Sequence, residues 1–165
     1  MMGAAGASGD DQTLFTWGGD FVSGAQGHGD TAARNSPVVL GSSGDWQLAQ
    51  PSSRDATFFL GANNSLWASG SNDRGQLGLG DTINRSSPVQ IGSLTDWGAI
   101  VAGDSHSQFF MTVKSDGTLW GWGYGADALG QGNALKYSSP VQVGSLTTWS
   151  NIRTGNAVSA GTIPA

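Results

Sequence analysis

A segment of about fifty residues is written three times along this chain, and that repetition constrains the fold more than any other feature. Trp46, Trp97 and Trp149 are spaced by 51 and 52 residues. The prolines of the blocks RNSPV, RSSPV and YSSPV keep the same two spacings. Because two unrelated residue types share one period, the chain is predicted to be an array of duplicated structural modules.

Each module contains short apolar strands separated by glycine-rich turns. In the second repeat the pattern predicts strands over 65–69, 88–91, 99–102 and 107–114. A hairpin signal follows at Asp116-Gly117, since glycine tolerates positive φ. Four short strands per unit are typical of a propeller blade. No stretch shows a sustained helical period, so we expect an all-β chain with little helix.

The composition fits a turn-rich β domain and excludes several functional classes. Glycine supplies 27 of 165 residues and only 12% of residues are charged, against averages of about 7% and roughly 25%. A hydrophobic fraction of 38% with seven tryptophans can form a packed core. A net charge of −5 with only seven Lys and Arg argues against a nucleic-acid partner. The absence of cysteine excludes disulfide frameworks and thiol nucleophiles.

The chain divides into a tail and a repeat domain. Residues 1–12 form a Gly/Ala-rich tail, and the repeats run over about 13–64, 65–117 and 118–165. The tail has neither the basic start nor the apolar run of a secretory signal. No segment approaches the roughly 18 apolar residues that span a bilayer. We therefore expect no membrane partner.

The best preserved residues of the second repeat carry a family resemblance. The runs GQLGLGD (75–81), SPV (87–89), GDSHS (103–107) and KSDGTLWGWG (114–123) resemble the repeat of the regulator of chromosome condensation family. The resemblance covers nearly everything after the tail, although the first and third repeats are degenerate. It implies a partial β-propeller of about three four-stranded antiparallel blades, whereas complete family members close seven blades into a ring.

The number of strands indicates that the array is open. Propellers close with about four to eight blades, and this chain has at most three. In the third repeat the counterpart of the strand 109–113 is predicted to be missing, which makes the last blade incomplete. An open sheet edge invites pairing with another chain, so we expect a subunit of an assembly whose partners are copies of itself or other proteins.

Neither catalytic, cofactor-binding nor metal-binding residues are predicted. The Gly-rich run 75–81 lacks the Lys and Ser/Thr of a phosphate-binding loop. Acidic residues are scattered at turns, where Asx side chains bond nearby backbone, and match neither a calcium loop nor a paired-carboxylate hydrolase. His106 is interpreted as a structural histidine that bonds backbone within its blade, and His28 as an exposed or half-buried substitution.

The tryptophans allow two interpretations, a carbohydrate-stacking platform or a structural core. The core is favoured, because the aromatic positions recur at constant phase. The predicted structural repeat core consists of Trp46, Trp97, Trp149, Trp67, Trp120 and His106.

The turns that differ most between repeats are the candidates for partner contact. They are the turns over 18–24, 70–75 and 123–127, and the nominated contact residues are Asp20, Phe21, Asn72, Asp73, Arg74, Tyr124 and Asp127.

Two functional hypotheses follow, and neither is an enzyme. The first is a structural protein of a phage virion, as capsid decoration or as a tail or fibre component, located in the virion. The second is a free-standing propeller-type binding module for a protein, a glycan or a host receptor, soluble in the cytoplasm or released without a signal peptide. The resemblance also implies GTPase exchange activity, but nothing here matches the inserted hairpin on which that activity depends.

Overall fold

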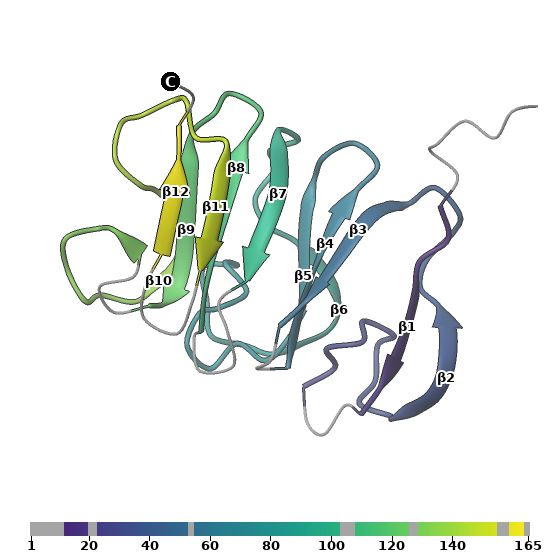
Figure 1. The fold of residues 1–165 in the computed structure, drawn as a ribbon. Helices are drawn as coiled ribbons and strands as arrows, with labels where there is room; N and C mark the ends of the chain where they lie inside the picture. The colour runs from purple at the N-terminus through teal and green to yellow at the C-terminus, as the bar shows by residue number, and fades with distance from the viewer. Residues whose placement is uncertain are drawn as a thin grey trace, which may run out of the picture.

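The residues that the structure describes form twelve antiparallel strands in four successive sheets (Figure 1). The computed structural model describes residues 12–19, 23–52, 55–102, 108–125, 129–154 and 159–163. Two sheets have four strands and are called the complete blades here. Two sheets have only two strands and are called the half-sheets. The strands alternate with the predicted glycine-rich turns, which confirms the all-β architecture.

The first half-sheet and the first complete blade occupy one end of the array. The half-sheet consists of β1 (Phe15–Gly18) and β2 (Arg34–Val39). The first complete blade consists of β3 (Trp46–Pro51), β4 (Ala56–Gly61), β5 (Leu66–Gly70) and β6 (Arg85–Gln90).

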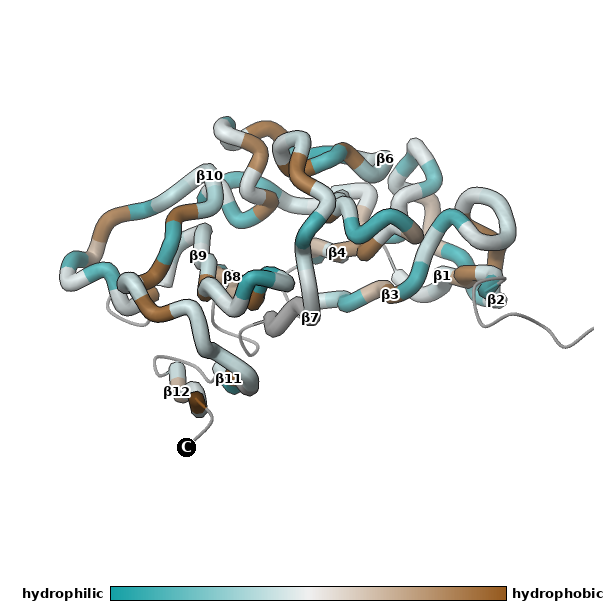
Figure 2. Tube along the Cα trace, turned by 90° about the horizontal axis from the view of Figure 1, so that it is seen from above, coloured by the Kyte–Doolittle hydropathy of each residue, from teal (hydrophilic) through white to brown (hydrophobic). Residues whose placement is uncertain are grey.

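The second complete blade and the second half-sheet follow. The blade consists of β7 (Trp97–Ala102), β8 (Gln108–Lys114), β9 (Leu119–Tyr124) and β10 (Tyr137–Gln142). The half-sheet consists of β11 (Asn151–Thr154) and β12 (Ser159–Thr162). Seen from above, the sheets follow one another along a curved row from β1 and β2 to β11 and β12 (Figure 2).

The blades are offset from the sequence repeats by two strands. The second repeat does contain the four predicted strands, but β5 and β6 belong to the first complete blade, whereas β7 and β8 belong to the second. Each complete blade therefore takes two strands from one repeat and two from the next. The prediction of about three blades becomes two complete blades with a half-sheet on either side.

One expectation about the third repeat is wrong. The counterpart of the strand 109–113 is present as β12, and its residues pair antiparallel with β11, Ile152 opposite Gly161 and Arg153 opposite Ala160. The backbone of residues 151–154 thus finds partners within the chain, in residues 159–162. The final sheet still has only two strands, because the counterparts of β9 and β10 do not follow it among the described residues.

Two hydrophobic cores lie between neighbouring sheets rather than inside one. The first joins the two complete blades and includes Phe58 from β4 with Trp97, Phe110 and Trp122 from the second blade. The rings of Phe58 and Phe110 lie with their centroids 4.1 Å apart. A second cluster, with Phe109, Met111, Leu119, Leu129, Val143 and Ile152, joins the second blade to β11. Burial of these apolar faces holds successive sheets together.

A repeated glycine lets two strands come close together. Gly70 ends β5 with a φ of 110°, and Gly123 lies near the end of β9 with a φ of 95°. A Cβ atom added to either glycine would lie 2.1 Å from a backbone carbonyl oxygen, that of Asp55 or of Gln108. Only glycine combines this backbone conformation with such a close approach.

Candidate functional site

The loops that join β1 to β2, β5 to β6 and β9 to β10 lie at the same end of their sheets. They span 19–33, 71–84 and 125–136, and they contain the candidate partner-contact residues except Tyr124, which is the last residue of β9. Because the three loops derive from one repeated sequence, side chains that they share are expected to maintain the fold. Side chains that differ between them are the better candidates for function.

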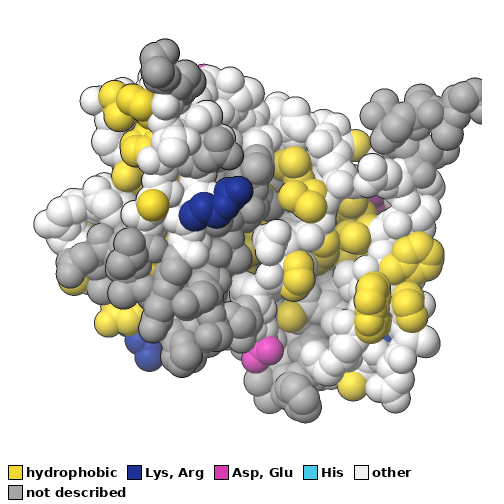
Figure 3. All heavy atoms as spheres, viewed as in Figure 1, with side chains coloured by type: hydrophobic (Ala, Val, Ile, Leu, Met, Phe, Trp, Pro, Cys, Tyr) yellow, Lys and Arg dark blue, Asp and Glu magenta, His cyan; other side chains and the backbone are white. Residues whose placement is uncertain are grey.

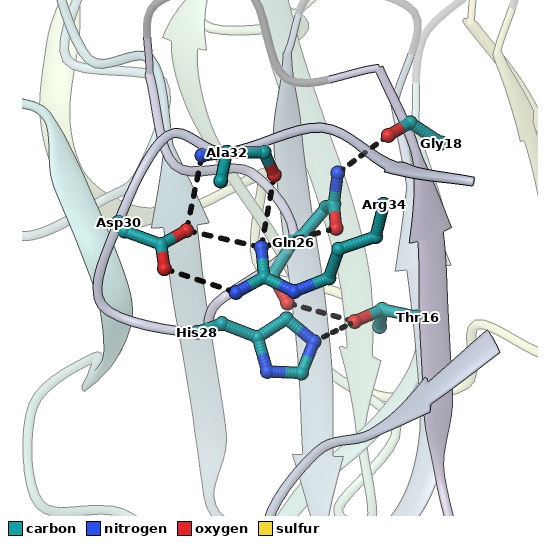
Figure 4. Close-up of polar contacts among 7 residues, drawn as sticks. All are labelled: Thr16, Gly18, Gln26, His28, Asp30, Ala32 and Arg34. Atoms are coloured by element: carbon teal, nitrogen blue, oxygen red, sulfur yellow. Dashed lines mark hydrogen bonds and ion pairs between the residues drawn. The ribbon is translucent and has the colours of Figure 1, made fainter. Parts of the chain in front are cut away.

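The first loop is held by an arginine fork (Figure 4). Arg34 donates from Nη1 to Asp30 Oδ1 and from Nη2 to Asp30 Oδ2, both at 3.0 Å, and also from Nη1 to the carbonyl of Ala32 at 2.9 Å. The Gln26 amide reaches across the loop and donates to the carbonyl of Gly18 at 2.7 Å. The hydrogen bonds from Arg34 lower the pKa of Asp30 below its usual value.

His28 lies beside this fork and faces β1. Its Nε2 is 2.8 Å from Thr16 Oγ1, and that hydroxyl also donates to the carbonyl of Gln26 at 3.0 Å (Figure 4). Partial burial and then the charge of Arg34 lower the pKa of His28. The half-buried position agrees with the interpretation of this histidine as a substitution within the turn.

The second loop has the same pairing of an arginine with an aspartate, and the buried amide side chain of Asn72 adds to it. Arg85 donates from Nη2 to Asp81 Oδ2 at 2.5 Å, and the backbone N–H of Ile83 donates to Asp81 Oδ1 at 3.0 Å. The bond from Ile83 is the main cause of the lowered pKa of Asp81. Asn72 donates to Asp81 Oδ1 at 2.9 Å and accepts from the N–H of Leu77 at 2.9 Å.

The burial of Asn72 corrects one expectation. This residue was nominated for partner contact, but it is fully buried and its side chain organises the loop from within. Asn72 is therefore not part of a surface that could contact a partner.

The third loop carries a neutral version of the same arrangement. Asn133 replaces the aspartate and Tyr137 replaces the arginine, and their side chains lie within hydrogen-bond distance of each other, at 3.0 and 3.2 Å. The N–H of Leu135 donates to Asn133 Oδ1 at 3.0 Å, as that of Ile83 does to the aspartate of the second loop. The three loops thus share a turn whose role is structural.

A group of side chains from two different blades has no counterpart in the first loop. The Arg74 guanidinium carbon lies 5.4 Å from the ring centroid of Tyr124, and the Lys136 ammonium lies 5.2 Å from the same centroid. Two exposed apolar residues of these loops, Ile83 at 64% and Leu135 at 61% exposure, occupy matching positions two residues before β6 and β10. These five residues are called the loop-end patch.

The other nominated contact residues have different outcomes. Asp73 is exposed, and its carboxylate lies 3.6 Å from Arg74 Nε and accepts from the Gln76 amide at 3.1 Å. Asp20, Phe21 and Asp127 lie outside the described residues. His106, assigned to the structural core, lies outside them as well.

The repeated tryptophans form edge-to-face pairs inside the complete blades. Trp46 and Trp67 have ring centroids 5.8 Å apart, and Trp97 and Trp120 have centroids 6.1 Å apart. Trp97 is only 4% exposed, while the other three are half-buried. The indole N–H groups of Trp67 and Trp120 donate to the hydroxyls of Ser65 and Thr118 at 2.7 and 2.8 Å. Trp149, two residues before β11, is half-buried.

Sequence reasoning missed Lys114. Its ammonium lies 4.9 Å from the Trp97 centroid and 4.8 Å from the Trp120 centroid, and 3.2 Å from a carboxylate oxygen of Asp96. The side chain is buried, so the cation is held between two aromatic faces. No signal in the sequence pointed to it, because the first repeat has Gly61 at the matching position.

The described part of the chain contains no group of three or more His, Asp or Glu side chains placed to hold a metal ion. Within the same residues, no helix has the length and apolar character needed to cross a membrane.

Comparison with known sequences places the repeats in a family. Residues 63–109 match the Regulator of chromosome condensation (RCC1) repeat. The chain is 32% identical over 141 residues to the E3 ubiquitin-protein ligase HERC2 of Homo sapiens and 32% identical over 138 residues to the ultraviolet-B receptor UVR8 of Arabidopsis thaliana. These alignments cover 83% and 81% of this chain but only 3% and 30% of the two relatives.

Solved structures show the same fold. Human WBSCR16 superposes with a TM-score of 0.75 at 17% identity, over 93% of this chain and 41% of that protein. Prp20p of Saccharomyces cerevisiae, whose structure was described together with its binding to Gsp1p and histones, superposes with a TM-score of 0.70 at 18% identity, over 93% and 40%. Residues 63–109 thus form a repeat of the RCC1 family, and the described sheets of the chain are β-propeller-like blades.

Proposed function

We propose that this protein is a non-enzymatic binding subunit that holds another protein against its loop-end patch. One observation carries the proposal. Arg74 and Lys136 come from different blades, yet both lie over the ring of Tyr124, and exposed apolar side chains accompany them in the same two loops. Arginine and tyrosine are enriched among the residues that dominate binding energies at protein interfaces.

The charge of the patch points to the kind of surface that fits it. The whole chain has a net charge of −5, but the patch presents two cations, with Asp73 as the acidic neighbour of Arg74. Opposite charge across an interface favours encounter and orientation. The expected partner surface is acidic at its rim and apolar where it meets Ile83 and Leu135.

The setting that we propose is a phage virion, where the partner is another virion protein and the subunit decorates the capsid or belongs to a tail or fibre. This setting rests on the cysteine-free, acidic and repetitive sequence. The ubiquitin ligase and photoreceptor activities belong to relatives of which this chain spans a small part, and they are not transferred to it.

Site-specific photo-crosslinking tests the proposal. A photoreactive phenylalanine analogue replaces Tyr124 or Leu135 in the protein as it is produced in its native particles or cells, and Leu94, an exposed residue of the β6 to β7 turn, serves as the control. We expect both patch positions to capture the same protein and position 94 not to capture it. Mass spectrometry of the captured protein identifies the setting, virion or otherwise.

The charge variants sharpen this test. Arg74→Ala and Lys136→Ala should each reduce the capture, whereas Arg153→Ala, which removes an exposed arginine from β11, should leave it unchanged. Capture of different proteins from the two patch positions, or equal capture from position 94, would contradict the proposal. Binding to a glycan array that depends on Tyr124 would instead favour a carbohydrate ligand.

A further inference from the structure

The two complete blades contain equivalent pairs of tryptophans. By the sequence repeat, Trp46 and Trp67 of the first blade correspond to Trp97 and Trp120 of the second. The ring planes meet at 88° in the first pair and at 82° in the second. The second pair holds the ammonium of Lys114, which lies 4.9 and 4.8 Å from the two ring centroids. The first complete blade therefore carries the aromatic part of the same cation site.

The same hydrogen bonds fix one ring of each pair. Trp67 Nε1 donates to Ser65 Oγ at 2.7 Å, and that hydroxyl donates to Asn63 Oδ1 at 2.6 Å. In the second complete blade the indole of Trp120 is held by a hydroxyl and a carboxylate in the same sequence, at 2.8 and 2.6 Å. The ring of Trp67 is thus held in place by the chain itself, without a ligand.

The carboxylate of the cation site is present in both blades as well. Asp96 directly precedes Trp97, and its carboxylate lies 3.2 Å from the Lys114 ammonium. Asp45 directly precedes Trp46, and its Oδ2 accepts a hydrogen bond from the N–H of Ser42 at 2.5 Å. The first complete blade therefore also retains a carboxylate beside its tryptophan pair, and the turn holds that carboxylate in position.

The cation is what the first complete blade lacks. Gly61 is the last residue of β4, as Lys114 is of β8. A pocket of about 510 Å³ lies at this place, and Gly61, Asp45 and both tryptophans line it. Leu40 and Pro88 add apolar walls to the pocket. Figure 3 shows further apolar side chains on the surface over the first half-sheet and the first complete blade.

A larger neighbour does not fill the space that the missing lysine leaves. Phe59 stands where the second complete blade has Thr112, since these residues pair with Trp67 and Trp120 respectively. The Phe59 ring packs against Trp46 with their centroids 5.3 Å apart, but Phe59 is fully buried and does not line the pocket. The pocket therefore remains in spite of the added bulk of this side chain.

We propose that this pocket binds a primary ammonium group on an aliphatic stem, the group that a lysine side chain carries. In the second complete blade the chain supplies this group itself, and in the first another molecule supplies it. Among the described residues, the lining contains one carboxylate, Asp45, and neither lysine nor arginine. A tryptophan face is the strongest aromatic partner for a cation. The apolar walls accommodate the stem.

Nuclear magnetic resonance of the ¹⁵N-labelled chain tests the proposal with butylammonium chloride as the probe. We expect the indole N–H signals of Trp46 and Trp67 to shift and to saturate with a dissociation constant of about a millimolar. The signals of Trp97 and Trp120 should stay in place, because Lys114 already occupies their site. The uncharged probe 1-butanol, which has the same stem, should cause no saturable shift.

Variants of the pocket separate charge from shape. Asp45→Asn should weaken the binding of butylammonium about fivefold or more, because it removes the carboxylate. Asp55→Asn is the control, since it removes the same charge from an exposed residue at the other end of β4. Gly61→Lys should abolish binding by supplying the ammonium from the chain. Gly61→Ala introduces the same Cβ, 2.6 Å from Ser65 Oγ, and should retain binding.

Three outcomes would overturn the proposal: equal shifts with butanol, undiminished binding to Asp45→Asn, or undiminished binding to Gly61→Lys. A further titration with Nα-acetyl-lysine amide separates two sources of the ligand. Tighter binding than that of butylammonium would support a lysine of another protein, and equal binding would support a small free amine. The pocket and the loop-end patch involve opposite ends of β5, so either can fail without affecting the other.

Discussion

The two complete blades and the two half-sheets are made from the same repeat, yet they differ in how their shared positions are used. In the second complete blade Trp97 and Trp122 are buried among aromatic neighbours. In the first half-sheet the position of Trp122 is held by Trp17, which is 60% exposed. The comparison teaches that a residue of one sheet becomes part of a core only where a second sheet packs against it, because the cores lie between sheets.

The largest expected effect separates the two tryptophan environments. Trp97→Ala should lower the free energy of unfolding by about 3 to 5 kcal/mol, the range for large aromatic truncations in packed cores. Trp17→Ala should change it by about 0.5 kcal/mol or less, as for exposed side chains. Urea denaturation of the two variants measures both losses. Similar losses for the two variants would break the comparison.

Glycine variants give the next largest effect. Gly70→Ala combines an unfavourable φ with a collision against the carbonyl oxygen of Asp55, and should cost about 2 to 4 kcal/mol. Gly18→Ala also has an unfavourable φ, but its added Cβ would meet no atom within 4 Å, and the variant should cost about 1 to 2 kcal/mol. The difference between the two melting curves isolates the strand contact. No difference would mean that strand packing contributes nothing at Gly70.

Lys114 allows the second complete blade to be compared with the second half-sheet. Lys114→Ala should cost about 2 kcal/mol, since it removes a cation held between two indole rings and leaves Asp96 without its partner. Ile163 holds the matching position after β12 and is 49% exposed, so Ile163→Ala should have little effect. Lys114→Met keeps the aliphatic stem and should recover part of the loss. Thermal unfolding of the three variants should show the largest loss of stability for Lys114→Ala, a smaller loss for Lys114→Met and the smallest for Ile163→Ala. A Lys114→Ala variant as stable as the unmodified chain would contradict this account.

The smallest expected effect is a difference in pH dependence between loops. Hydrogen bonds lower the pKa values of Asp30 and Asp81 in the folded chain. Their contribution to stability is therefore complete above the ordinary aspartate pKa of about 3.9 and is lost as the pH falls through the lower folded values. Asn133 of the third loop does not titrate in this range.

The same argument applies to His28 at higher pH. Its lowered pKa means that the unfolded chain takes up a proton first, so stability falls as the pH drops from about 6.5 through the folded value. The variant His28→Leu, which introduces the residue of the second repeat, should remove that slope. Chemical-shift titration of Asp30, Asp81 and His28 measures their folded pKa values. The free energy of unfolding, measured against pH, checks their effect on stability. A folded His28 pKa at or above 6.5 would contradict this account.

The sequence predicted the repeated strands because branched and aromatic residues mark them. It missed β12, whose residues Ser159–Thr162 are small and carry no strand signal. That strand exists because β11 presents a partner for it, which is a tertiary cause. The two-strand offset between the sequence repeats and the blades could not be predicted either, because a period gives the length of a unit but not the residue at which a sheet begins.

The candidate site was predicted only in part. Variable loops did contain Arg74 and Tyr124, and the structure brings them together. Differences between the repeats could not show whether a side chain points into the loop, as that of Asn72 does, or toward solvent. Both kinds of residue differ from their counterparts in the other loops. Lys136 was missed because only the fold places it over Tyr124.

The two-strand offset has a consequence for how such a chain can change length. Because each complete blade is assembled from the end of one repeat and the beginning of the next, inserting or deleting one whole unit of 51 or 52 residues would add or remove one complete blade. The half-sheets would be left as they are. Gene duplication can therefore lengthen the row of blades without redesigning either of its ends.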